Sequence, residues 1–102
     1  MEIHKVVHLD DLQESRPHQV VLDGRQILLT KVYGQPLAVA DACPVDGAAL
    51  SEGTVVGGRA VCPMGGCSFR LADGELLSDP GMHVDVFATR LTADNWVEIE
   101  VP

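Results

Sequence analysis

Two short cysteine-proline segments constrain this chain more than any other part of it. Residues 43–47 read Cys-Pro-Val-Asp-Gly, and residues 62–67 read Cys-Pro-Met-Gly-Gly-Cys. Together they contain all three cysteines of the chain, and an odd number leaves at least one cysteine without a disulfide partner within it. In a reducing compartment, cysteines grouped in this way indicate metal binding, redox chemistry or buried thiols before structural disulfides.

The rest of the chain is a series of short strand patterns joined by tight turns. Asp23-Gly24 is a strong signal for a two-residue hairpin turn, and residues 93–95 are expected to join the last two strands as a hairpin. Only residues 9–12 favour a helical turn, with Asp10 as its cap. Short strands at this spacing predict an all-β sandwich or small barrel. The predicted strands cover residues 3–8, 18–22, 26–32, 37–40, 54–56, 59–61, 68–71, 75–77, 84–91 and 96–101.

Length and composition predict one folded domain over residues 1–102. The chain has 102 residues, of which 46% are hydrophobic, and this argues against disorder. No apolar run approaches the roughly 18 residues that a membrane span needs. Residues 1–5 lack the apolar core of a secretory signal, so a cytoplasmic location is expected.

The charge of the chain limits its partners. A net charge of −8 excludes a general nucleic-acid binder, which needs a basic face. An acidic surface suits a protein that docks on a basic patch of a larger enzyme, because charge steering accelerates association. The alternative is that the acidic residues only keep a small domain soluble.

Several segments follow one another in an order that characterises a known family. They are residues 9–12 after the first predicted strand, 22–25 through 38–41 ahead of the first cysteine, the cysteine-proline pairs with residues 47–53, Gly66, Phe69, and residues 74–76. This ordered set resembles a Rieske-type [2Fe–2S] ferredoxin of the kind that serves ring-hydroxylating oxygenases. The resemblance implies an antiparallel Rieske-fold β-sandwich or small barrel. Its cysteine-bearing loops, 43–53 and 62–67, would form a cluster-binding-like tip, and residues 78–83 would cover that tip.

The resemblance also shows what the chain lacks. Rieske domains supply Cys-x-His from one loop and Cys-x-x-His from the other, so that two thiolates hold one iron and two imidazoles hold its neighbour. Here Cys43 and Cys62 stand at the positions of the cluster cysteines, whereas Val45 and Gly65 occupy the histidine positions. Neither of these side chains can bind iron. The resemblance therefore predicts a degenerate site without an ordinary Rieske cluster.

Three outcomes remain open for such a site. Cys67, which the resemblance implies to lie near the pocket of Cys43 and Cys62, could join them with His83 or Asp46 to hold zinc or an unusual iron–sulfur centre. His83 could equally be a solvated histidine at a strand end. The second outcome is a disulfide, Cys43–Cys62 or Cys62–Cys67, of which the first would close about 20 residues and contribute roughly 3 kcal/mol. The third outcome is three reduced, buried thiols.

The predicted function is that of a ferredoxin-like accessory protein in a multicomponent redox or oxygenase system. Rieske-fold subunits without cluster ligands are known as a class, and the small subunit of NADH-dependent nitrite reductases resembles this pattern. The partner would be a larger oxygenase or reductase component. Met64 and Met82 are candidate partner contacts. Electron transfer through a remodelled centre is the alternative. A thiol-dependent enzyme is a third, with Arg59 and Arg70 as the nearby positive charges that could activate a thiol.

Overall fold

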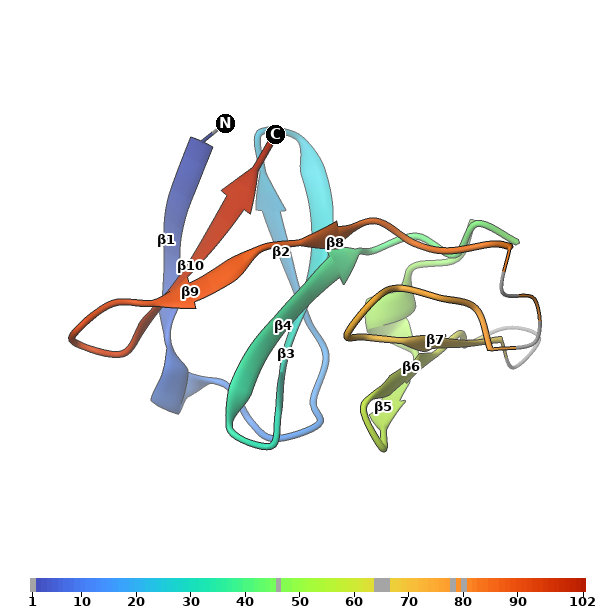
Figure 1. Ribbon diagram of the computed structural model, residues 1–102, viewed down its shortest axis with the longest axis horizontal. Coiled ribbons are helices and arrows are strands. Elements are labelled where there is room, and N and C mark those ends of the chain that lie inside the picture. The colour runs from blue at the N-terminus through green and yellow to red at the C-terminus, as the bar shows by residue number, and fades with distance from the viewer. Residues whose placement is uncertain (1, 46, 64–66, 78, 80) are drawn as a thin grey trace.

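The structure is a computed structural model that describes residues 2–45, 47–63, 67–77, 79 and 81–102. In these ranges the chain forms short β-strands and two single-turn 3₁₀ helices, η1 (Leu9–Asp11) and η2 (Leu50–Glu52), shown in Figure 1. The strands are β1 (Glu2–His8), β2 (His18–Leu22), β3 (Arg25–Val32), β4 (Gln35–Ala40), β5 (Thr54–Val56), β6 (Arg59–Val61), β7 (Ser68–Arg70), β8 (Val86–Phe87), β9 (Thr89–Leu91) and β10 (Trp96–Val101).

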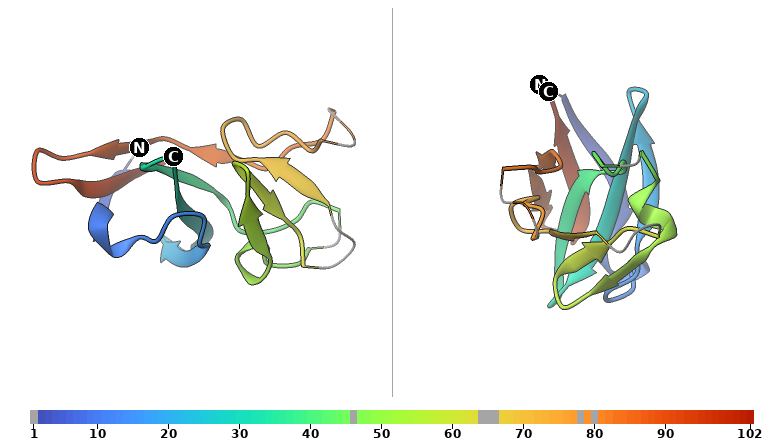
Figure 2. Two further views of the ribbon diagram at one scale, coloured as in Figure 1. Left: turned by 90° about the horizontal axis from the view of Figure 1, so that it is seen from below. Right: turned by 90° about the vertical axis from the view of Figure 1, so that its right-hand side faces the viewer.

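The strands form three sheets in which the neighbouring strands are antiparallel. Their orders are β1-β10-β9, β2-β3-β4-β8 and β5-β6-β7. Figure 2 shows the β5–β7 sheet, in green and yellow, at one end of the molecule beside the two other sheets. The predicted all-β antiparallel architecture is therefore confirmed.

The four-stranded sheet is central because its strand β3 is buried on both faces. Alternate residues of a strand point to opposite faces, so Ile27 and Leu29 pack on one side and Leu28 and Val32 on the other. We name the two resulting groups the strand cluster and the loop cluster. The strand cluster comprises Leu12, Ile27, Leu29, Ala38, Phe87, Val97, Ile99 and Val101. The loop cluster comprises Leu28, Val32, Val39, Cys43, Leu50, Val55, Ala60, Cys62, Phe69, Leu71, Leu76 and Val84.

The hairpin between β2 and β3 forms at the predicted turn. Leu22 pairs with Arg25 across it, and the two residues between them have positive φ angles of 52° at Asp23 and 76° at Gly24. Two positive φ angles define a type I′ turn, for which Asp-Gly is a preferred pair. The turn lies at the end of the molecule where β1 begins (Figure 1), and the Asp23 Oδ2 lies 3.4 Å from the Nε2 of His4 in that strand.

The prediction of one strand over residues 84–91 was wrong. The segment divides at Ala88, so that β8 pairs with β4 in the central sheet and β9 pairs with β10 in another. Backbone hydrogen bonds on either side mark the change: the Ala40 N–H donates to the Asp85 carbonyl at 2.8 Å, and the Glu100 N–H donates to the Ala88 carbonyl at 2.9 Å. Switching partners lets one extended segment join two packed sheets at a corner.

The predicted strand at residues 75–77 is reduced to isolated bridges. Leu76 pairs with Phe69, and Glu75 pairs with His83. The chain turns back tightly here because Gly74 has a φ of 76° and lies against the Val84 carbonyl, where an added Cβ would overlap the oxygen. The segment that follows also bonds to this turn: the Leu76 N–H donates to the Met82 carbonyl at 2.9 Å, and the Val84 N–H donates to the Gly74 carbonyl at 2.8 Å.

The helical turn after β1 is present, but its predicted cap was wrong. His8, rather than Asp10, caps η1, since its Nδ1 accepts a hydrogen bond from the Asp10 N–H at 3.1 Å. None of the helices in the described part of the chain is long and apolar enough to cross a membrane.

Candidate functional site

The two cysteine loops begin at equivalent points of the fold and close in the same way. Cys43 comes shortly after β4 and donates its backbone N–H to the Ala48 carbonyl at 2.8 Å. Cys62 directly follows β6 and donates its backbone N–H to the Cys67 carbonyl at 2.7 Å. Each hydrogen bond joins a cysteine to the residue five positions later. The fold therefore presents two similar short loops side by side, one from each of two sheets.

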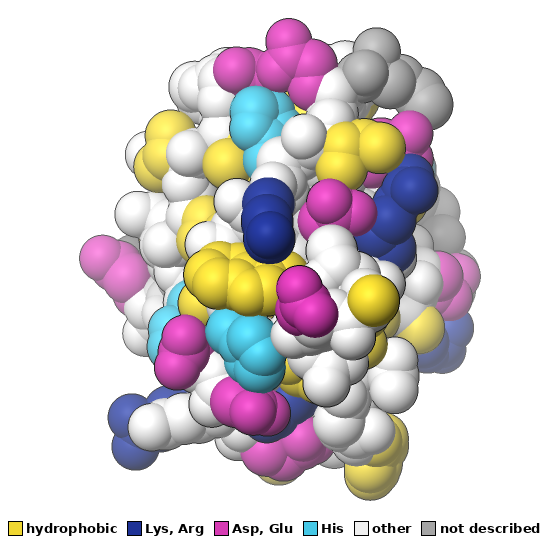
Figure 3. Space-filling view, turned by 90° about the vertical axis from the view of Figure 1, so that its left-hand side faces the viewer, with side chains coloured by type: hydrophobic (Ala, Val, Ile, Leu, Met, Phe, Trp, Pro, Cys, Tyr) yellow, Lys and Arg dark blue, Asp and Glu magenta, His cyan; other side chains and the backbone are white. Residues whose placement is uncertain are grey.

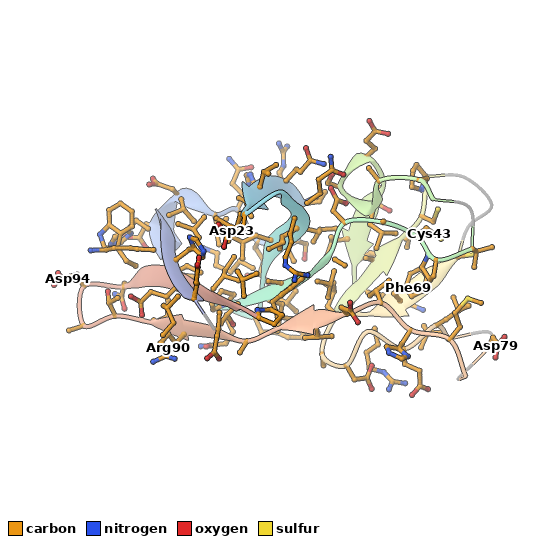
Figure 4. All side chains as sticks on the ribbon, turned by 90° about the horizontal axis from the view of Figure 1, so that it is seen from above. Asp23, Cys43, Phe69, Asp79, Arg90 and Asp94 are labelled. Atoms are coloured by element: carbon orange, nitrogen blue, oxygen red, sulfur yellow. The ribbon has the colours of Figure 1, made fainter. Side chains whose placement is uncertain are left out.

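The cysteine side chains pack against a single hydrophobic group. Cys43 and Cys62 are 2% and 3% exposed and belong to the loop cluster, and the partly buried Cys67 packs against it. All three are thiols in the structure rather than a disulfide. Figure 4 shows Cys43 and Phe69 at the loop-bearing end of the molecule, with Asp79 beyond them at its extremity. A buried cysteine at such a position fills the core as a small apolar side chain as well as offering a thiol.

The other predicted site residues lie in different surroundings. Val45 is 53% exposed, and His83 is exposed and paired through its backbone with Glu75. Met82 is partly buried against the loop cluster. Asp46, Met64 and Gly65 lie outside the described residues. Among the described side chains, no three donor atoms from the cysteines and His83 lie within 4.8 Å of one another. The metal and partner-contact roles remain predictions.

A buried acidic residue that the sequence reasoning did not single out holds the first loop closed. Asp41 is 2% exposed and directly follows β4. Its Oδ1 accepts a hydrogen bond from the Ser51 N–H at 2.6 Å. Its Oδ2 accepts one from the Ser51 hydroxyl at 2.6 Å and one from the Gln19 amide at 2.7 Å. These three residues, the Asp41 clamp, join the start of the loop to its end at η2 and to β2.

The end of the first loop lies directly against the start of the second loop. At Gly53, an added Cβ would overlap the backbone carbonyl oxygen of Val61 and would lie 3.1 Å from the Pro63 nitrogen. Gly53 has an ordinary negative φ of −92°, so the requirement for glycine is steric. The two loops therefore depend on this close backbone approach for their relative position.

The positive charges proposed to activate a thiol are arranged on β6 and β7. Arg59 and Arg70 are register partners on these strands, and Arg70 forms an ion pair with Asp73 at 2.7 Å. The backbone N–H of Glu75 donates to Asp73 and lowers the pKa of its carboxyl below the usual 3.8, and Arg70 lowers it further. The guanidinium of Arg70 is thus engaged by a neighbouring carboxylate, and the thiol-enzyme interpretation remains a prediction.

The family model for the Rieske-like [2Fe-2S] domain matches residues 2–100, and the chain therefore belongs to the Rieske-like [2Fe-2S] domain family. The match includes both cysteine loops and the sheets that hold them. The predicted family is thereby confirmed.

Relatives of known sequence or structure agree with this membership. The chain is 35% identical over 77 residues to Apoptosis-inducing factor 3 of Mus musculus and of Homo sapiens, which covers 76% of this chain and 13% of the length of those proteins. A Mycobacterium tuberculosis protein assigned as NADH-dependent nitrite reductase small subunit is 31% identical, with a TM-score of 0.87 over 99% of this chain and 96% of that chain. A chain of the complex of reduced oxygenase and oxidized ferredoxin in carbazole 1,9a-dioxygenase is 27% identical, with a TM-score of 0.86 over 95% of this chain and 100% of that chain.

Proposed function

We propose that this chain is a ferredoxin-like accessory component of a multicomponent redox or oxygenase system and that its [2Fe–2S] site is degenerate. Membership of the Rieske-like family supports the first part. So does its similarity to a protein assigned as nitrite reductase small subunit and to a chain of an oxygenase–ferredoxin complex. The partner is then a larger oxygenase or reductase component.

The donor chemistry of the two loops carries the second part of the proposal. A [2Fe–2S] cluster needs four protein donors, two on each iron. Cys43 and Cys62 supply two, but the position of the first histidine holds Val45, an exposed hydrocarbon side chain. The position of the second histidine holds Gly65, which has no side chain and therefore no donor atom. The residues present therefore do not fit an ordinary Rieske centre.

A domain without a cluster would act by binding a larger enzyme through its surface. Its net charge of −8 gives it an acidic exterior that is attracted to a basic patch on a larger enzyme. In the described parts of the two loops, the Asp41 clamp joins the start of the first loop to its end, and Gly53 lies against the start of the second loop. Docking through the end that carries these loops would position or stabilise the catalytic component without itself moving electrons.

One observation favours a second candidate, electron transfer through a remodelled centre. Cys67 packs against the same cluster that contains Cys43 and Cys62, so three thiols lie at one end of the fold. Three thiolates with a fourth donor suit zinc or a non-standard iron–sulfur centre. An iron–sulfur centre with thiolates in place of imidazoles would have a potential toward about −400 mV.

The test is an iron measurement on protein prepared without oxygen, together with a variant that restores the missing ligands. We expect the natural chain to be colourless and nearly free of iron after cluster reconstitution. We expect the double variant Val45→His, Gly65→His to bind two irons and to show the visible absorption of a Rieske centre. Cys43→Ser in that background should abolish the absorption.

The results separate the two candidates. Two irons per natural chain would contradict the degenerate site, and if Cys67→Ser then removed them, the remodelled centre would be correct. The accessory role is tested separately by omitting the protein from the assembled enzyme system. Unchanged activity of the catalytic component without it would overturn that part of the proposal.

A further inference from the structure

Three potential metal ligands meet at the end of the molecule where β1 begins, away from Cys43 and the cysteine loops (Figure 4). Glu2 and His4 are two residues apart on β1 and therefore face the same side of that strand, and Asp23 lies in the type I′ turn between β2 and β3. One donor atom from each of the three residues lies within 4.8 Å of the other two. At the top of Figure 3, acidic side chains lie next to a histidine side chain on this end of the molecule. The group connects two different sheets.

The distances in this group match those between the ligands of one metal ion. The His4 Nε2 lies 3.2 Å from the Glu2 Oε2 and 3.4 Å from the Asp23 Oδ2. Zinc–nitrogen and zinc–oxygen bonds of about 2.0–2.1 Å at tetrahedral angles place neighbouring donors about 3.3–3.4 Å apart. These two distances therefore fit a metal ion of this size, the donor atoms of Glu2 and Asp23 lie within 4.8 Å of each other, and a fourth position remains for water.

The hydrogen bonding of the same histidine nitrogen adds to this geometry, although the His4 side chain is 27% exposed. The His4 Nε2 is buried and has no hydrogen-bond partner among the described residues, although two carboxylate oxygens lie beside it. Both oxygens are close enough to form ion pairs with a charged imidazole, but neither contact is a well-formed hydrogen bond. Buried polar atoms are rarely left without a partner, and such an atom calls for an explanation. A metal ion in the space between the three donors supplies the missing partner.

The acidic side chains of the group also favour a cation. The Glu2 Oε2 and the Asp23 Oδ2 both lie beside the His4 Nε2. Two carboxylates that lie side by side repel each other, and a cation bound between them removes that repulsion.

We propose that Glu2, His4 and Asp23 bind a divalent transition-metal ion of the zinc class, which ties β1 to the β2–β3 turn. An imidazole together with carboxylates suits such ions, whereas magnesium and calcium take oxygen ligands alone. The site is independent of the proposed function, because it uses none of the residues of the cysteine loops. Its role is structural: the ion fixes the first strand to the neighbouring sheet.

The test compares two Asp→Asn variants in the full chain. Asp23→Asn removes a ligand but keeps the turn, because Asn-Gly is as well suited to a type I′ turn as Asp-Gly. The matched control is Asp10→Asn, whose carboxylate also lies near a histidine, 3.7 Å from the His8 Nδ1, but belongs to no three-donor group of described residues. Glu2→Gln is a second ligand variant at an exposed position.

The readout is the nitrogen NMR signal of the imidazoles during a Zn²⁺ titration, because it distinguishes His4 from any zinc bound by the thiols. We expect the His4 Nε2 signal to shift in the natural chain and in Asp10→Asn. We expect the affinity at His4 to fall at least about tenfold in Asp23→Asn and in Glu2→Gln. An unshifted His4 signal in the natural chain at excess Zn²⁺ would overturn the proposal. So would equal affinity in the natural chain and both ligand variants.

Discussion

Replacing Asp41 by alanine should destabilise the protein more than any change to its hydrogen-bond partners. The carboxyl group of Asp41 is buried and accepts three hydrogen bonds, two from Ser51 and one from Gln19. Three donors aimed at two oxygens match an ionised carboxylate, which can only accept. Asp41→Ala removes the acceptor and leaves the donors in place.

The size of the destabilisation depends on which of the three donors can hydrogen-bond to water once the Asp41 carboxyl group is removed. A hydrogen bond to a charged group contributes about 1.5–3 kcal/mol, and an unsatisfied buried donor has a comparable penalty. Gln19 is exposed, so its amide can hydrogen-bond to water instead, and losing its bond to Asp41 lowers stability little. The Ser51 N–H is held in place by η2 and cannot turn to solvent. We therefore expect Asp41→Ala to lower the free energy of unfolding by about 3–5 kcal/mol, a large part of the usual stability of a domain.

Two further variants separate the hydrogen bonds from the loss of volume. Asp41→Asn keeps the shape and one acceptor oxygen, and the Ser51 hydroxyl and Gln19 amide can reorient, so we expect about 1–2 kcal/mol. Ser51→Ala removes only the hydroxyl bond and should lower stability by about 1.5 kcal/mol.

The assay is urea unfolding followed by tryptophan fluorescence and circular dichroism. With an m-value of about 1.5 kcal/mol/M, Asp41→Ala should lower the midpoint by about 2 M or more. If Asp41→Ala and Ser51→Ala had equal midpoints, or if Asp41→Ala remained within about 0.5 kcal/mol of the natural chain, the clamp would not hold the loop.

Two other substitutions test the loop contacts and the pH dependence. Gly53→Ala forces a Cβ against the Val61 carbonyl and should lower the unfolding free energy by about 2–4 kcal/mol. Gly81→Ala, whose Cβ would meet its nearest atom at an ordinary 3.5 Å, should change it by less than about 0.5 kcal/mol in the same urea assay. The folded-state pKa of Asp73 is lowered, so its contribution is present above pH 3.8 and is lost as the pH falls through the folded value. Asp73→Asn, which also loses the ion pair with Arg70, should thus be less stable than the natural chain at pH 7. This difference should shrink below pH 4 in acid unfolding curves, and a difference independent of pH would contradict the reasoning.

Much of the fold could be predicted from the sequence because its signals are local. Alternating apolar residues predicted β2, β5, β6 and β10 at their observed bounds, and Asp23-Gly24 predicted the hairpin turn. The division of residues 84–91 at Ala88 could not be predicted in this way. Hydrophobic alternation indicates which face of a strand is buried, but not which sheet each half of a strand joins. That choice depends on how two sheets pack.

The same distinction between local and long-range contacts holds for the candidate site. The cysteine loops were recognisable because their residues are close together in the sequence. The Asp41 clamp was not, since Asp41 meets Ser51 and Gln19 only when the loop and β2 pack together. The Glu2–His4–Asp23 group was missed for the same reason, as it unites a strand and a turn about 20 residues apart. An acidic residue between a buried strand and a cysteine is the local signal that could have pointed to Asp41.

The described contacts that hold the two loops in place are contacts between protein atoms. They can therefore form whether or not a cofactor is bound. The first loop is closed by Asp41, and its end is seated against the second loop at Gly53. Cys43 and Cys62 are core side chains, so replacing them disturbs packing whether or not iron is bound. Position 45 is exposed, and substitutions at exposed positions usually change stability by less than about 0.5 kcal/mol. If the site is degenerate as proposed, a valine in place of an imidazole there leaves the architecture intact, and the two cysteines are then evidence for the core as much as for a metal.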